Sequence, residues 1–129
     1  MNLREDFESN SANAPAVETW LWLAQRISAV VLAVMIVTHL GTVIYAVRGG
    51  LTAAEIIARV GGSMGWAIFY GVFVTAVAVH APIGLRAIIK EMTALPQTRV
   101  DLLCFIAAVL IGYLGYCVVG DFYRLGAIS

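Results

Sequence analysis

Residues 27–47 read ISAVVLAVMIVTHLGTVIYAV, an apolar stretch that carries no formal charge. As a helix, its roughly 21 residues are about 31 Å long, which matches the thickness of the hydrocarbon core of a bilayer. The stretch also lacks the alternation of apolar and polar residues that a membrane-spanning β-strand needs. This segment therefore predicts a transmembrane α-helix.

Two further uncharged stretches, residues 64–85 and 102–120, are long enough to span a membrane in the same way. The chain has 129 residues, of which 61% are hydrophobic and 12% are charged, against about 45–50% and about 25% in typical soluble proteins. Eight basic and eight acidic side chains leave no net charge, which gives no indication of a nucleic-acid partner. The sequence therefore predicts an all-α integral membrane bundle of three transmembrane helices.

Charges and glycines divide the chain around these spans. The amphipathic segment LTAAEIIAR, residues 51–59, follows Gly49-Gly50. Thr52 and Glu55 have the spacing of a capping box, so a short interfacial helix is expected here. The predicted order is a polar cytoplasmic tail (1–19), transmembrane helix 1 (20–47), an outer loop with the interfacial helix (48–63), transmembrane helix 2 (64–90), a cytoplasmic loop (91–100), transmembrane helix 3 (101–120) and an outer C-terminal tail (121–129).

The distribution of Lys and Arg predicts the orientation, because cytoplasmic loops carry more of these residues than outer loops do. The N-terminal side of the first span and the second loop together hold five of them, whereas the first loop and the C-terminal tail hold three. We therefore expect a cytoplasmic N-terminus and an outer C-terminus, in a multi-pass protein of a bacterial-type cytoplasmic (inner) membrane.

The chain contains two histidines, His39 and His80, and both lie inside predicted spans. A titratable side chain is costly at membrane depth and usually marks a function. One interpretation is a hydrogen bond between neighbouring helices. A proton relay is less well supported, because no Asp or Glu lies within the three uncharged stretches. The third interpretation is axial ligation of a b-type haem, since imidazole is a common haem ligand and no C-x-x-C-H motif for covalent attachment occurs.

The depths of the two histidines favour two separate haem sites. His80 is about 9 Å of helix from Arg86, and His39 is about 20 Å from Arg26 on the same side of the membrane. The two imidazoles therefore differ in depth by roughly 10 Å, whereas two ligands of one iron would lie only about 4 Å apart. We expect each histidine to bind a different haem, with the second ligand supplied by another subunit.

Two short motifs resemble a known family. Residues 23–29, LAQRISA, resemble the HR-x-[ST]-G motif that opens the first helix of cytochrome b anchor subunits of succinate dehydrogenase and fumarate reductase. Residues 80–86, HAPIGLR, resemble the H-x-x-x-G-[IL]-R motif in the second helix of the same family. In the first motif, Gln25 takes the place of the usual histidine.

The resemblance implies a set of functional residues. It implies that His80 is an axial ligand of haem b, as the family's motif histidine is, and that Arg86 lies near the haem propionates. Arg26 would border the quinone pocket, together with Trp22 or Ser28. Two-haem members of the family use histidines in corresponding helices, which extends the axial role to His39.

The resemblance also implies a complex. The chain would be one part of a larger haem-binding bundle, shared with a second membrane-anchor subunit. An iron–sulfur subunit and a flavoprotein subunit with FAD would dock on its cytoplasmic face. The cofactors expected for this chain are one or two haems b shared with a partner, and quinone is the expected substrate. The chain would thus be a subunit of a succinate:quinone oxidoreductase or quinol:fumarate reductase that passes electrons between iron–sulfur clusters and a membrane quinone, without carrying the dicarboxylate site.

Two alternatives remain open from the sequence. The chain is also compatible with a haem b anchor of another quinone-linked dehydrogenase. The other alternative is a haem-free small transporter or assembly protein. The absence of a b-type haem band from the optical spectrum would distinguish it from both anchor interpretations.

Overall fold

The structure, a computed structural model, describes the backbone of residues 3–128 and the side chains of residues 15–128. Within residues 3–128 the chain forms four helices and no strand. These helices are α1 (Leu3–Arg48), α2 (Ala53–Val60), α3 (Met64–Met92) and α4 (Gln97–Ala127). The three long helices are each apolar and long enough to cross a membrane. The predicted all-α bundle of three transmembrane helices is therefore confirmed.

The helices are longer than the predicted spans. α1 begins at Leu3, so the segment 3–19, expected to be a polar tail, continues directly into the first span. Once the apolar part is helical, adding further residues needs no new nucleus, and Ala and Glu favour the helical state. α1 is about 69 Å long, more than twice the thickness of a bilayer core. α4 likewise runs past residue 120 to Ala127.

The connection between α1 and α3 contains the predicted capping box. Gly50 adopts a positive φ of 65° just after α1 ends. The Glu55 carboxylate accepts hydrogen bonds from the Thr52 backbone N–H at 2.7 Å and the Thr52 hydroxyl at 2.8 Å. In return, the Glu55 backbone N–H donates to Thr52 Oγ1 at 3.3 Å, which confirms the box. The hydrogen bonds from Thr52 hold the pKa of Glu55 below its usual value.

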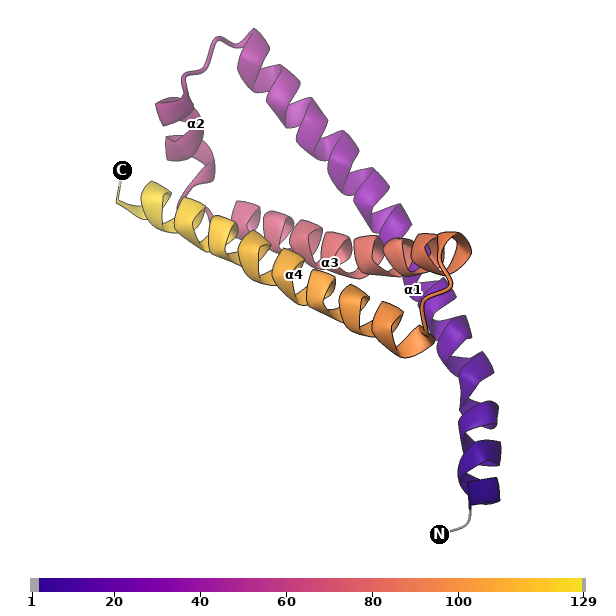
Figure 1. Cartoon of the computed structure of the whole chain (residues 1–129). Coiled ribbons are helices and arrows are strands. Elements are labelled where there is room, and N and C mark those ends of the chain that lie inside the picture. Colours follow the sequence, from indigo (N-terminus) through magenta and orange to yellow (C-terminus); the bar gives the residue numbers. More distant parts are fainter. Residues whose placement is uncertain (1–2, 129) are drawn as a thin grey trace.

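Helices α3 and α4 lie side by side, whereas α1 crosses α3 and then diverges from it (Figure 1). The α3–α4 contact is close because Gly115 lacks a side chain: a Cβ atom there would lie only 2.5 Å from Val74 Cγ1. Beyond the crossing, α2 leads the chain back to the far end of α4. The result is a bundle in which α3 is the central helix.

Two glycines allow α2 to reach α4. The backbones of Gly61 and Gly126 touch, so that a Cβ atom on Gly61 would lie 2.6 Å from Gly126 Cα. Beside them, the backbone N–H of Gly62 donates to the Tyr123 carbonyl at 3.1 Å. This contact closes the end of the bundle that lies opposite the N-terminus.

Gly126→Ala is expected to destabilise the protein by about 1–3 kcal/mol, because the added methyl group has no space against the Gly61 backbone. Gly120→Ala is the matched control, since nothing lies within 4 Å of the added Cβ atom. That control should be stabilising by about 0.5–1 kcal/mol, as expected for Gly→Ala within a helix. Thermal unfolding of the detergent-solubilised variants measures both effects. Equal melting temperatures for the two variants would contradict the close contact.

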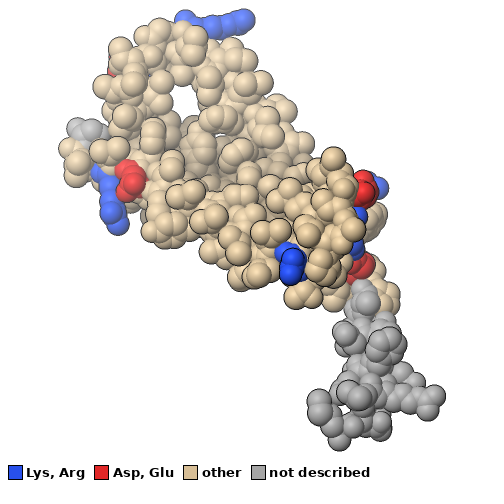
Figure 2. All heavy atoms as spheres, viewed as in Figure 1, with Lys and Arg blue, Asp and Glu red and all other residues tan. Residues whose placement is uncertain are grey.

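Charged side chains gather at the two ends of the molecule and leave an uncharged region between them (Figure 2). We call the end that holds Glu18, Arg86, Lys90 and Asp101 the N-side end. Large apolar side chains are exposed along the helices between the ends, with Val37 at 72% and Phe105 at 67% exposure. This pattern fits a protein whose outer surface contacts lipid or other membrane helices.

Candidate functional site

His80 on α3 is hydrogen-bonded to Ser28 on α1. The Ser28 hydroxyl, whose residue is only 6% exposed, lies 3.2 Å from His80 Nδ1 and donates its own proton to the Gln25 carbonyl at 3.1 Å. In the tautomer of His80 that carries its proton on Nδ1, a lone pair of Ser28 Oγ accepts this hydrogen bond. That tautomer leaves the lone pair of Nε2 available for a metal ion.

His39 on α1 has a similar partner on the opposite helix. Its Nδ1 lies 3.1 Å from the Tyr70 hydroxyl on α3. The Tyr70 and Phe73 rings pack against the imidazole, with ring centroids 5.7 Å and 6.4 Å away. Trp66 stacks on Tyr70 in turn. His39 is thus held through Nδ1 among aromatic rings, and the hydrogen bond to Tyr70 is compatible with either tautomer.

The structure places the two histidines at different depths. His80 contacts α1 at Ser28, whereas His39 contacts α3 at Tyr70. The positions of Tyr70 and His80 on α3 differ by about ten residues, or about 15 Å of helix. This separation is far larger than the distance of about 4 Å between two ligands of one iron.

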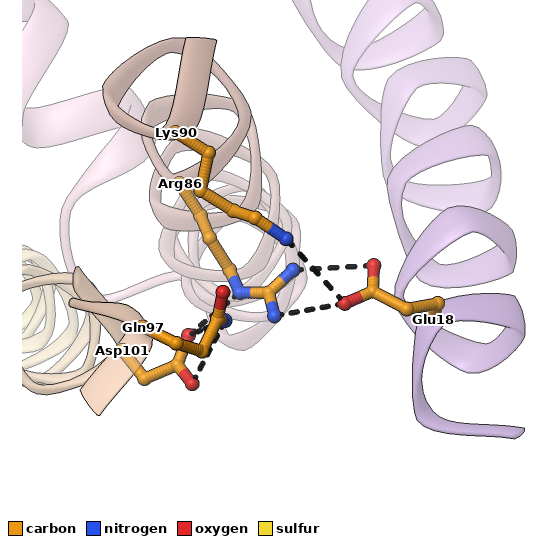
Figure 3. Close-up of polar contacts among 5 residues, drawn as sticks. All are labelled: Glu18, Arg86, Lys90, Gln97 and Asp101. Atoms are coloured by element: carbon orange, nitrogen blue, oxygen red, sulfur yellow. Dashed lines mark hydrogen bonds and ion pairs between the residues drawn. The ribbon is translucent and has the colours of Figure 1, made fainter. Parts of the chain in front are cut away.

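Arg86 lies at the N-side end and is bound by two carboxylates (Figure 3). Its Nη2 and Nη1 atoms donate to the two oxygens of Glu18 on α1, at 2.9 Å and 3.3 Å. Its Nε donates to Asp101 on α4 at 2.7 Å. Asp101 also accepts from Gln97, and Lys90 lies 3.8 Å from Glu18. Arg86 therefore joins all three long helices, and in this chain its guanidinium faces carboxylates.

The structure does not bring all three residues predicted to border a quinone pocket to one cavity. Trp22 lines a cavity of about 380 Å³ between α1 and α3, beside Gln25, Gly84 and Arg86. The Arg26 guanidinium lies 4.9 Å above the Trp22 ring in a cation–π contact, and Arg26 itself does not line the cavity. Ser28 lies elsewhere, against His80.

Four residues that contact the predicted site residues or line this cavity were not themselves predicted as site residues. Gln25 lines the cavity with a buried side-chain oxygen that has no hydrogen-bond partner, and Gly84 leaves room for its amide group, since a Cβ there would lie 3.3 Å from Gln25 Nε2. Glu18 and Tyr70 were missed because their partners are distant in the sequence. Only Gln25 had a signal in the sequence, because the family motif that residues 23–29 resemble has a histidine at this position.

Among the residues with described side chains, no group of three His, Cys, Asp or Glu is placed to hold a metal ion. A haem needs only one imidazole from a chain when another subunit supplies the second ligand, so a cluster of that kind is not required.

Comparison with known proteins gives one match. The family model described as succinate dehydrogenase/fumarate reductase transmembrane subunit matches residues 7–115, a range that contains both histidines, all of α3, most of α1 and the first part of α4. No curated protein and no solved structure matches the chain significantly.

Proposed function

Because the chain belongs to the succinate dehydrogenase/fumarate reductase transmembrane subunit family, we propose that it is a cytochrome b anchor of such a complex, with His80 as an axial ligand of haem b. The observation that carries this proposal is the contact between Ser28 Oγ and His80 Nδ1 at 3.2 Å, because it would hold the Nδ1–H of a ligand imidazole and leave Nε2 for the iron. Bound haem b supplies reversible one-electron transfer between iron states.

Small residues on α3 would give a flat ligand room beside His80. His80 is half-buried, and Ala76, one turn before it on roughly the same face, is small. With Nε2 bound to iron, Nδ1 would carry the proton, and the Ser28 hydroxyl would accept a hydrogen bond from it, which orients the ring and increases the basicity of Nε2. Serine and histidine come from different helices, so the packing of α1 on α3 sets the orientation of the ligand.

We propose His39 as a ligand of a second haem. Its separation from His80 excludes a shared iron, and Tyr70 holds its Nδ1. The second axial ligand at each site would come from a second membrane-anchor subunit, which would cover part of the exposed apolar surface of this chain. The competing role for His39, a hydrogen bond that only joins α1 to α3, predicts a different haem content and is tested below.

The cavity at the N-side end is the proposed quinone site. Its volume of about 380 Å³ is in the range of small-molecule sites. Trp22 provides an aromatic wall, and the side-chain amide oxygen Oε1 of Gln25, which has no hydrogen-bond partner, would accept a hydrogen bond from a quinol hydroxyl. Arg26, stacked on Trp22, would supply positive charge near this aromatic wall. Because the Ser28 hydroxyl is already bonded to Gln25 and His80, the structure favours Trp22 and Gln25 over Ser28 as quinone contacts.

The family also supports the proposed assembly. The N-side end would face the cytoplasm and receive the iron–sulfur subunit, with the flavoprotein subunit attached to it. This chain would then hold the membrane cofactors and the quinone, while the dicarboxylate chemistry takes place on the flavoprotein.

A dithionite-reduced minus oxidised spectrum of the purified complex tests the proposal. We expect a low-spin b-type α-band and, from the haem content of the intact complex, about two haems for each copy of this chain. A complex with FAD and iron–sulfur clusters but no b-type haem would contradict it and would support a haem-free anchor.

A further inference from the structure

Three polar contacts join α1 to α3, and they follow one another in antiparallel order. Along α1 they occur at Glu18, Ser28 and His39. Their partners on α3 are Arg86, His80 and Tyr70, which run in the opposite direction along the chain. All three contacts therefore require the same alignment of the two helices.

The remainder of the α1–α3 interface specifies this alignment weakly. A second cavity between the two helices is lined by small and β-branched residues such as Ala24, Val31 and Ala76. Side chains of this kind pack against one another in several alignments, whereas a hydrogen bond or ion pair is lost when its atoms separate. A slip of one helical turn moves α1 by about 5.4 Å, which would break all three polar contacts.

We propose that Glu18 is a positioning residue that, through Arg86, sets the alignment of α1 on α3 and so places Ser28 against His80. The proposal rests on the proposed haem role of His80. It also gives Arg86 a function in this chain that differs from contact with a haem propionate.

The geometry of the Arg86 contacts supports this function. The two-pronged contact with Glu18 is specific in distance and angle, because a guanidinium and a carboxylate pair through two parallel hydrogen bonds. Asp101 fixes the same guanidinium from α4, and the Arg86 side chain is only 14% exposed. Isolated exposed ion pairs contribute little, but two-pronged pairs within a network are the exception. Glu18, Arg86, Asp101 and Lys90 together carry no net charge.

The midpoint potential of the His80 haem tests the proposal in the whole complex. When Ser28 moves away, Nε2 becomes less basic and the oxidised iron is less stabilised, so the potential should rise. We expect a rise in both Glu18→Gln and Arg86→Gln, and a larger rise in Ser28→Ala. Glu91→Gln is the matched control, since Glu91 is an exposed acid of the same region with no ion pair among the described residues.

The two substitutions at the ion pair separate alignment from simple electrostatics. Loss of a negative charge raises the potential and loss of a positive charge lowers it, so an electrostatic effect alone gives shifts of opposite sign. If Arg86 contacted a haem propionate, Arg86→Gln would also lower the midpoint potential. Opposite signs, or a control shift equal to that of Glu18→Gln, would therefore overturn the proposal.

A cross-linking experiment measures the alignment without haem. A Cβ atom at position 84 would lie 3.3 Å from Gln25 Nε2, the far end of that side chain, so a short bifunctional thiol reagent should cross-link the double variant Gln25→Cys/Gly84→Cys in the full chain expressed without haem. The exposed Cys117 is replaced by serine to prevent side reactions. Adding Glu18→Gln should lower the yield severalfold, and adding Glu91→Gln should not. No cross-link in the parent, or the same yield with Glu18→Gln, would contradict the proposal.

The two proposals fail in different ways. If the wild-type complex contains no b-type haem, the proposed function fails, and the cross-linking result still decides whether Glu18 sets the alignment. If haem is present and the potentials of the Glu18 and Arg86 variants move in opposite directions, the proposed function stands and the positioning role fails.

Discussion

Replacing His80 with alanine is expected to remove the haem that we propose it binds, while the complex remains assembled. An axial bond is lost and nothing nearby replaces it, since the neighbouring Ser28 hydroxyl is a poor ligand for haem iron. Loss of a residue that only supports a metal ligand lowers metal affinity about 10–100-fold. Loss of the ligand itself should therefore lower haem affinity by more than about 100-fold. The amplitude of the α-band in the difference spectrum should decrease by the contribution of one haem.

Val79→Ala is the matched control for this experiment. Val79 precedes His80 on α3 and is 37% exposed, so its truncation changes the same helix without touching the imidazole. It should keep the full haem content. An unchanged spectrum in an assembled His80→Ala complex would contradict the ligand assignment.

The second large effect is expected for His39→Ala, which should remove the other haem and lower the haem content of the complex by about half. The His80 haem should keep its spectrum and potential, because the two sites are separated by about 15 Å of helix. Quantification of haem per flavin in the purified complex measures this change.

Tyr70→Phe distinguishes ligation from simple helix packing at His39. If His39 only joins α1 to α3, removing either partner of the hydrogen bond should lower stability alike and leave the haem content unchanged. If His39 is a ligand, Tyr70→Phe should retain the haem with an altered potential, whereas His39→Ala should lose it. Full haem content in His39→Ala would contradict the second site.

Features that depend on local sequence were predicted well. The three spans follow from the length of the uncharged stretches, and the capping box follows from the spacing of Thr52 and Glu55. The sequence analysis did not predict that the polar segment 3–19 is helical, because a polar segment that continues an established helix has no pattern of its own. Hydrophobicity does not predict which residues of these helices are buried, because the outer surface of a membrane helix is as apolar as its packed face.

The candidate site was predictable only in part. Two histidines at membrane depth stand out in any apolar sequence, but their partners Ser28 and Tyr70 depend on how α1 aligns with α3. Arg86 was recognisable at the end of a span, but its partner Glu18 is far away in the sequence and lies within the segment expected to be a tail. Contacts of this kind arise from packing, which hydropathy does not encode.

The central claim is that the Nε2 atom of His80 is bound to haem iron while its Nδ1 atom is held by Ser28. A cryo-electron microscopy map of the assembled complex, resolved well enough to show side chains, tests this claim most directly. We predict porphyrin density joined to His80 Nε2, with Ser28 Oγ at hydrogen-bond distance from Nδ1. A map with no porphyrin beside His80, in a complex that retains its flavin and iron–sulfur clusters, would contradict the account.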